Sequence, residues 1–307
     1  MTSVRLHGLL RVAASSNPLF NDGRAAIAAT HRNTDVRIST CMFRIAIIVS
    51  GLVLLASCAS APQVSPAARS ELAPTGKLRV GINFQNILLT RKDPVTGETG
   101  GIALDLAHEL GRRLGVPVEI VPYPTAGHLA DAVRTGAWDV AFLAAEPQRA
   151  NVIAFTAPYL EIETTYLVPA GSPFRIVEDV DRDGVRIAVG AKGGPDLALS
   201  RILKRAQLVR APTAAAAARM FVTDKLDALA GLKPALVLDA EKVPGSRILE
   251  GWFSVVGQAV GTHKGHDAGA KFLSEFVEDI KMSGLVARVI EKNGVRGLSV
   301  APMKATP

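Results

Sequence analysis

The sequence contains very little cysteine and few aromatic residues. It has two Cys in 307 residues, Cys41 and Cys58, and Phe, Trp and Tyr together make up 5%. Two thiols cannot build a disulfide framework, and no Lys/Arg cluster is interleaved with aromatic side chains as in nucleic-acid-binding faces. A P-loop, a Gly-x-Ser-x-Gly motif and a dinucleotide fingerprint after a strand are also missing. We therefore expect no nucleic-acid partner and no cofactor.

Candidate metal ligands are sparse as well. His263 and His266 place two imidazoles three positions apart, but two imidazoles alone do not complete a zinc shell. We interpret this pair as part of a surface turn and expect no metal site.

The segment that ends at Cys58 differs from the rest of the chain. An apolar run follows Arg44 and ends in Leu55-Ala56-Ser57-Cys58. A positive residue, a short apolar region and small residues are typical of a secretory signal peptide, and the run is too short to span a bilayer. The motif resembles a bacterial lipobox, which implies that Cys58 carries a lipid that holds the mature chain on a membrane surface.

This predicted signal begins at Met42, although the chain is numbered from Met1. Residues 1–41 either precede the natural start of translation or form a long n-region, and both alternatives remain open. Residues 1–57 carry six Arg and two Asp, so without them the formal charge of +7 falls to +3. The basic character therefore belongs mainly to the segment that maturation would remove. Residues 58–75, rich in Pro, Ser and Ala, have the composition of a tether.

From Lys77 onward the hydrophobic pattern alternates between strands and helices. Ile102, Leu106, Leu110 and Leu114 recur at helical spacing, and Gly115 ends the run. The first half predicts strands over 78–82, 118–121 and 138–142, with helices over 102–114 and 128–135. The second half predicts strands over 186–189, 207–209 and 226–230, a helix over 196–205, and a helix over 214–222 that Thr213 caps.

The two halves also share a local phrase, in which the end of a helix leads into a buried strand. It reads Thr135-Gly136-Ala137-Trp138-Asp139-Val140 in the first half and Thr223-Asp224-Lys225-Leu226-Asp227-Ala228 in the second. We therefore expect an α/β fold of two similar lobes, each a mostly parallel sheet with flanking helices.

Two extended apolar runs, 164–169 and 254–261, predict two crossings between the lobes, with a cleft between them. The expected boundaries are 76–166 for lobe 1, completed by 259–307, and 167–258 for lobe 2. Apolar faces over 268–282 and 285–291 predict two helices that cover a lobe.

Four phrases give the chain its resemblance to a known family. They are 76–81, Gly101–Leu106 ahead of Leu114-Gly115-Val116, Glu146-Pro147-Gln148-Arg149 followed by 155–159, and 282–285. Together they are similar to family 3 extracellular solute-binding proteins, the polar amino-acid-binding type that serves ATP-binding-cassette importers. The resemblance implies a two-lobed periplasmic-binding-protein-like fold, a small-molecule ligand, a membrane permease as partner, a monomer and a location in the periplasm.

The resemblance also implies where a ligand binds. Arg149 occupies the position that grips the ligand carboxylate, and a guanidinium suits this role because it pairs bidentately. On the second lobe, the turn that contains Lys192, Gly193 and Gly194 precedes a helix and would offer backbone N–H groups to an anion. A surface arginine, an ordinary tight turn and a solvated Lys192 are the alternatives.

Three departures from the family pattern bear on the ligand. Ala144 lies in an apolar stretch where relatives have Ser or Thr, and Leu232, five positions after Asp227, stands where relatives have the acid that binds an ammonium group. Phe84 and Asn86 occupy the region of the aromatic lid, and Phe84 could equally belong to the core. A zwitterion without a counter-charge is disfavoured.

We therefore expect a small anion, carboxylate-bearing, between Arg149 and the Lys192 turn. Two further functions stay open. The same fold resembles cyclohexadienyl dehydratases, for which Glu161 and Glu163 are the acids that we would nominate. A sensor module for a partner membrane protein is the other.

Overall fold

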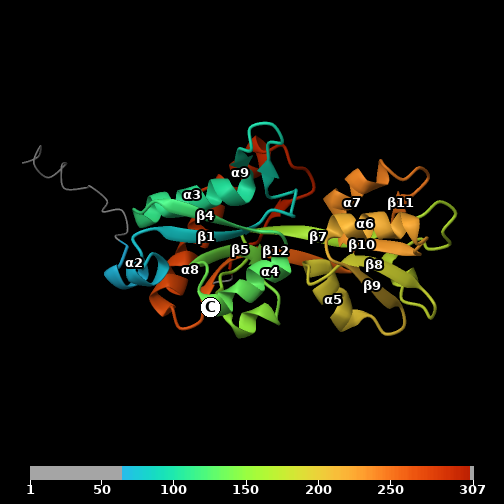
Figure 1. Ribbon diagram of the computed structural model, residues 1–307, viewed down its shortest axis with the longest axis horizontal. Helices are drawn as coiled ribbons and strands as arrows, with labels where there is room; N and C mark the ends of the chain where they lie inside the picture. The colour runs from blue at the N-terminus through green and yellow to red at the C-terminus, as the bar shows by residue number, and fades with distance from the viewer. Residues whose placement is uncertain (1–63, 305–307) are drawn as a thin grey trace, which may run out of the picture. The chain divides into compact units, whose positions relative to one another are not determined.

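The computed structural model describes residues 64–304, so the predicted signal peptide, Cys58 and the first part of the predicted tether lie outside the described residues. The main sheet of this part has the strand order β4-β1-β5-β12-β7-β10-β8-β9. Figure 1 shows that the sheet continues through two lobes, each with helices on both of its faces.

Lobe 1 contains the first parallel unit and the C-terminal helices. Its strands are β1 (Leu78–Asn83), β4 (Val118–Tyr123), β5 (Val140–Ala144), β6 (Ile153–Phe155), β13 (Ser299–Val300) and the small hairpin of β2 (Arg91–Lys92) and β3 (Thr99–Gly100). Its helices are α2 (Pro66–Leu72), α3 (Ile102–Leu114), α4 (Ala126–Asp131), α8 (Asp267–Met282) and α9 (Leu285–Lys292), with short 3₁₀ turns η1 (Ala132–Thr135) and η2 (Arg149–Asn151).

Lobe 2 repeats the arrangement with fewer elements. Its strands are β8 (Arg186–Gly190), β9 (Gln207–Ala211), β10 (Ala228–Leu232) and β11 (Arg247–Ile248). Its helices are α5 (Gly194–Ile202), α6 (Ala214–Thr223) and α7 (Lys233–Ala240), with the 3₁₀ turn η3 (Val177–Asp179). In each lobe the inner strands run parallel: β1 pairs with β4 and β5, and β8 pairs with β9 and β10.

Two long strands connect the lobes. β7 (Leu160–Val168) and β12 (Ser254–His263) pair antiparallel with each other near the middle of the sheet, where Ser254 lies opposite Thr164. β12 then continues against β5 in lobe 1, while β7 continues against β10 in lobe 2. The predicted two-lobed α/β fold with two crossings is thus confirmed.

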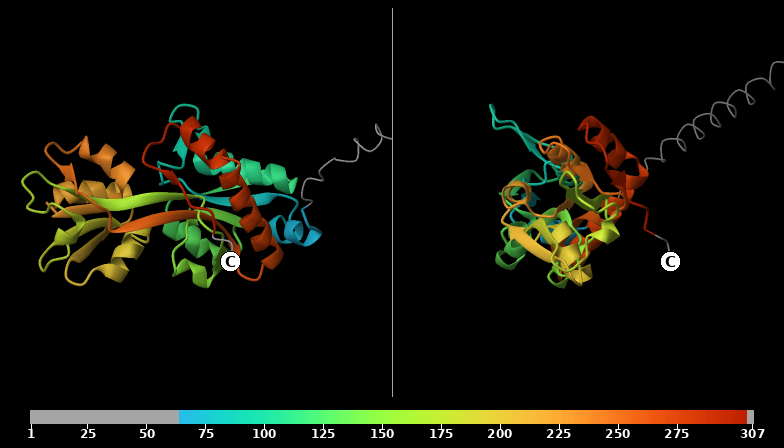
Figure 2. Two further views of the ribbon diagram at one scale, coloured as in Figure 1. Left: turned by 180° about the vertical axis from the view of Figure 1, so that it is seen from behind. Right: turned by 90° about the vertical axis from the view of Figure 1, so that its right-hand side faces the viewer.

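Each lobe is a three-layer sandwich because apolar residues lie on both faces of its sheet. In lobe 1, α3, α8 and α9 cover one face through residues such as Leu110 and Phe276, and α4 covers the other around Trp138. In lobe 2, α5 covers one face and α6 and α7 the other. Figure 2 shows α8 and α9 beside α2 and α3 on lobe 1.

The structure differs from the sequence prediction in the expected tether, 58–75. Pro66–Leu72 form helix α2, which begins after Ser65, whose Oγ accepts a hydrogen bond from Ala68 N at 3.1 Å. Leu72 is fully buried in the lobe 1 core, and Glu71 accepts a hydrogen bond from Gly269 N on α8. Ser65 as a cap and Pro66 in the first turn are favourable helix starts, and Leu72 supplies the packing that stabilises so short a helix.

None of the helices within residues 64–304 is both long and apolar enough to cross a membrane.

The shared phrase at the start of β5 and β10 has a shared structural role. In lobe 1, Asp139 N donates to Arg79 O, and Arg79 N donates back to Asp139 Oδ2 at 3.0 Å. In lobe 2, Asp227 N donates to Arg186 O, and Arg186 N donates to Asp227 Oδ2 at 2.7 Å. Each aspartate therefore fixes the register between two parallel strands.

The lobe 1 aspartate has an additional role. Asp139 is 3% exposed and also binds the Arg79 guanidinium through two hydrogen bonds of 2.6 and 3.0 Å, which raise the pKa of Arg79. The Arg186 guanidinium instead donates to Lys225 O.

We expect Asp139→Ala to lower the free energy of unfolding by roughly 2–4 kcal/mol, because it leaves a partly buried guanidinium and a backbone N–H without their partner. Asp227→Ala removes only the hydrogen bond from Arg186 N and should lower the free energy of unfolding by about 1 kcal/mol. Urea unfolding of both variants measures the difference. Equal losses would contradict the role assigned to the Arg79–Asp139 pair.

Candidate functional site

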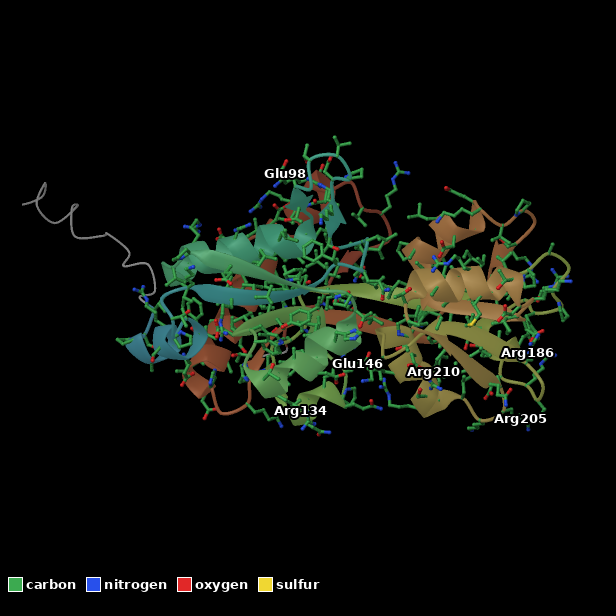
Figure 3. All side chains as sticks on the ribbon, viewed as in Figure 1. Glu98, Arg134, Glu146, Arg186, Arg205 and Arg210 are labelled. Carbon is green, nitrogen blue, oxygen red and sulfur yellow. The ribbon has the colours of Figure 1, made fainter. Side chains whose placement is uncertain are left out.

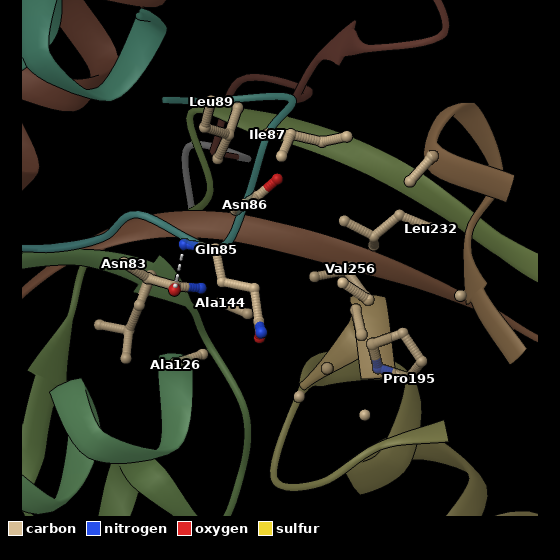
Figure 4. Close-up of a pocket in the computed structure, with 18 of the residues that line it drawn as sticks. Asn83, Gln85, Asn86, Ile87, Leu89, Ala126, Ala144, Pro195, Leu232 and Val256 are labelled. Carbon is tan, nitrogen blue, oxygen red and sulfur yellow. Dashed lines mark hydrogen bonds between the residues drawn. The ribbon is translucent and has the colours of Figure 1, made fainter. Parts of the chain in front are cut away.

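A cavity of about 380 Å³ lies between the two lobes. Its wall is largely apolar, and Figure 4 shows that lobe 1, lobe 2 and the crossing strands all contribute to it. The residues on which the following argument depends are Asn83, Gln85, Asn86 and Ala144 from lobe 1, Gly193, Gly194, Leu232, Asp239 and Lys242 from lobe 2, and Val256 and Gln258 from β12.

Five of the residues expected at the site line this cavity, namely Asn86, Ala144, Gly193, Gly194 and Leu232. Arg149, Lys192 and Phe84 do not line it. Phe84 packs against the lobe 1 core and borders a separate pocket near Tyr123.

Arg149 lies behind the cavity wall, where it joins the lobes. The side chain is on η2 and the residue is 5% exposed. Its Nη1 donates to Ala144 O in lobe 1 at 2.9 Å, and its Nη2 donates to Lys192 O in lobe 2 at 2.8 Å. Burial lowers the pKa of Arg149 to about 10, although the charges of Glu146 and Asp131 oppose this shift, so the group stays protonated at neutral pH.

Two ion pairs accompany this contact across the gap between the lobes. Glu146 of lobe 1 is 6% exposed and accepts from Arg201 Nη1 on α5 at 2.8 Å. Lys192 Nζ lies 2.8 Å from Asp131 Oδ2 of lobe 1, and both of these side chains are exposed. Figure 3 shows Glu146 on the side of lobe 1 that faces lobe 2.

The turn before α5 is held in place by Asp196. Lys192 adopts a left-handed conformation, with φ of 55°, and its N–H donates to Asp196 Oδ2 at 2.7 Å. The same carboxylate accepts from Arg210 Nε at 2.8 Å. A Cβ atom at Gly194 would lie 2.9 Å from Val256 Cγ2, so glycine permits the close approach of α5 to β12.

The polar groups on the cavity wall are mostly amides. Gln258 is 5% exposed, and within residues 64–304 its side chain makes no hydrogen bond. Gln85 extends into the space between the lobes (Figure 4), and its side-chain amide likewise has no partner in the described part of the chain. The charged residues of the wall are Asp239 and Lys242, which pair with each other at 3.1 Å.

The acids nominated for an enzymatic role lie elsewhere. Glu163 binds Lys233 Nζ at 2.7 Å, and neither Glu161 nor Glu163 lines the cavity. Within the described residues, no group of three His, Cys, Asp or Glu side chains could hold a metal ion.

Sequence reasoning missed two features of this site. Helix α7, which begins after Leu232 and contributes Asp239 to the wall, was not predicted. Gln258 was also overlooked, although a single amide inside the apolar run 254–261 is an unusual residue for a buried strand. That isolated amide is the signal that could have identified it.

Comparison with protein families gives a match over most of residues 64–304, the part of the chain that the structure describes. The model for bacterial extracellular solute-binding proteins, family 3, matches residues 78–295. The comparison with curated protein sequences found no match.

Solved structures of similar fold are numerous. A mutant of ArgBP from T. maritima is 26% identical, with a TM-score of 0.63, over 74% of this chain and 99% of that chain. An ancestral amino acid-binding protein, described as a precursor of cyclohexadienyl dehydratase, is 24% identical, with a TM-score of 0.63, over 73% and 98%. An amino acid ABC transporter substrate-binding protein from Streptococcus pneumoniae, bound to L-arginine, is 21% identical, with a TM-score of 0.63, over 76% and 99%. The last two show the fold alone.

Two arginine–carboxylate pairs of nearly equal geometry allow the contacts between lobes to be tested. Arg201–Glu146 joins the lobes, whereas Arg210–Asp196 lies within lobe 2, and the N–O distance is 2.8 Å in both pairs. The side chains of Arg201 and Arg210 are 38% and 46% exposed, and those of Glu146 and Asp196 are 8% and 5% exposed. We expect Arg201→Met to favour separation of the lobes. In this variant the Glu146 carboxylate is buried without a partner while the lobes are closed, and it reaches water when they separate. Small-angle scattering should show a larger radius of gyration for Arg201→Met and no change for Arg210→Met. Equal values for both variants would contradict the assignment.

Proposed function

Because the chain belongs to family 3 of the bacterial extracellular solute-binding proteins, we propose that it captures a small organic solute between its two lobes and delivers it to the permease of an ATP-binding-cassette importer. Membership of this family implies an extracytoplasmic location. The similarity to ArgBP supports the choice of a small-molecule ligand.

The observation that carries this proposal is the position of the cavity. It lies between two lobes that β7 and β12 connect, and residues of both lobes form its wall. A solute in this cavity would contact lobe 1 and lobe 2 at once, so it would stabilise the closed arrangement relative to an open one. The permease could then recognise the loaded protein by its closed shape.

The anion site between Arg149 and the Lys192 turn stays a prediction of the sequence. In the closed arrangement both groups already have partners, since Arg149 binds two carbonyl oxygens and Lys192 Nζ binds Asp131. An anion at this place would have to displace the Lys192 carbonyl from Arg149.

A dehydratase activity receives less support. The ancestral neighbour is described as a precursor of such an enzyme, but its own description is that of an amino acid-binding protein. A general acid must reach the substrate, and Asp239, the acid that does lie on the cavity wall, is paired with Lys242.

Attachment to a membrane through lipid on Cys58 is part of the same proposal. The support is the sequence alone: Arg44, the apolar run and the small residues before Cys58. A lipid anchor would keep the binding protein close to the permease that it serves.

Leu232→Trp tests the use of the cavity. The indole would fill space between the lobes, so we expect this variant to lose ligand-induced stabilisation. Val237→Trp, on the outward side of α7 where the residue is 47% exposed, is the control. Thermal melts against amino acids, organic acids and their uncharged derivatives, with native mass spectrometry of the purified protein, measure binding. No stabilising compound and no bound small molecule in the wild type would contradict the proposed function.

Cys58→Ser tests the anchor. We expect this variant to move from the detergent phase to the aqueous phase in detergent phase separation of whole cells, because it cannot carry the lipid. Cys41→Ser, which changes the other cysteine of the chain, should stay in the detergent phase. Retention of the Cys58→Ser chain in the detergent phase would show that lipid on this residue does not anchor it.

A further inference from the structure

The charged side chains around the cleft balance one another. Arg149 binds two backbone carbonyl oxygens, Glu146 binds Arg201, and Asp196 binds Arg210 and the backbone of the turn before α5. The two carboxylates and Arg149 are buried, the Arg201 and Arg210 side chains are exposed, and none of these five residues lines the cavity.

The cavity wall itself is neutral. Its two charged residues, Asp239 and Lys242, pair with each other, and Lys242 is exposed. Leu232 and Val256 present hydrocarbon to the cavity. A ligand with a carboxylate or an ammonium group would lose water there and could gain a counter-charge only by breaking the Asp239–Lys242 pair, and the penalty is large for a charge left unpaired.

Unpaired amides face the same space. The Gln258 residue is 5% exposed and lines the cavity, and within the described residues its side-chain amide makes no hydrogen bond, so the amide is open to a solute in the cavity. Gln85 offers a second complete amide from the loop after β1. An amide both donates and accepts, so it matches a neutral carbonyl, amide or hydroxyl group.

Two further amides are partly used. Asn83 Oδ1 accepts from Gln85 N at 3.0 Å, a bond drawn in Figure 4, and Asn86 Oδ1 accepts from Leu88 N at 3.3 Å. Their NH₂ groups remain available as donors, which places donors on the lobe 1 side of the cavity and a complete amide on β12.

We propose that the cavity binds an uncharged solute with an apolar body, which exchanges hydrogen bonds with Gln258 and Gln85. This inference rests on the proposed function, because it names the ligand class of the same cavity. An amino acid in its zwitterionic form and a simple carboxylate are the alternatives that the test must separate.

A charge series with one carbon skeleton separates them. Leucine, N-acetylleucine, leucinamide and N-acetylleucinamide are zwitterionic, negative, positive and uncharged at about pH 6, and the corresponding phenylalanine series provides a larger body. Isothermal titration calorimetry on the full chain should show that the uncharged member binds at least about tenfold more tightly than the other three in one or both series.

Other outcomes overturn the inference. Tighter binding of a zwitterion or of an anion would do so while leaving the proposed function intact. The inference is also overturned if neither uncharged compound binds, or if a charged compound is recovered bound to the purified protein. A wild type that binds no small molecule at all would remove the proposed function together with the inference.

Substitutions at the amides give a second measurement. We expect Gln258→Leu to weaken N-acetylleucinamide or N-acetylphenylalaninamide binding by about tenfold or more, since a buried hydrogen bond to the solute is lost. Gln85→Leu provides an independent test in a loop, should the strand variant fold poorly. Gln207→Leu, at an exposed position of β9, is the matched control and should bind as the wild type does. Unchanged affinity in both cavity variants would remove these amides from the site.

Discussion

A guanidinium that is buried without a carboxylate partner has to find oxygen atoms in the backbone. Arg149 finds one in each lobe, Ala144 O and Lys192 O, and it remains charged because its pKa falls only to about 10. A buried charge satisfied by two carbonyl groups costs much less than one left bare. The closed arrangement of the lobes therefore gives the Arg149 guanidinium both of its hydrogen-bond acceptors, and separation of the lobes exposes the guanidinium to water instead.

The same contact decides what the cleft can recognise. The Arg149 guanidinium binds the protein's own carbonyl oxygens, while hydrocarbon side chains, amides and the Asp239–Lys242 pair form the wall of the cavity. Charged groups thus hold the lobes together, and the cavity wall is mainly hydrocarbon and amide, with one paired acid and base. Selectivity in such a cavity comes from the cost of stripping water from charged compounds as much as from contacts with the correct one.

Much of the fold could be predicted because its signals are local. The spacing from Ile102 to Leu114 gives α3 within its observed bounds, and Thr213 caps α6 as expected. Helix α2 was missed because Pro, Ser and Ala are typical of a tether, and only packing of Leu72 in the core makes the helix stable. The partners of Arg149 could not be predicted, because backbone oxygens carry no signature in the sequence.

A crystal structure of the protein with the solute that it retains on purification tests the account most directly. We expect the Arg149 guanidinium still to bind Ala144 O and Lys192 O, and an uncharged polar group of the solute to form a hydrogen bond with the Gln258 amide. A solute carboxylate seated on Arg149, with the Lys192 carbonyl displaced, would contradict it.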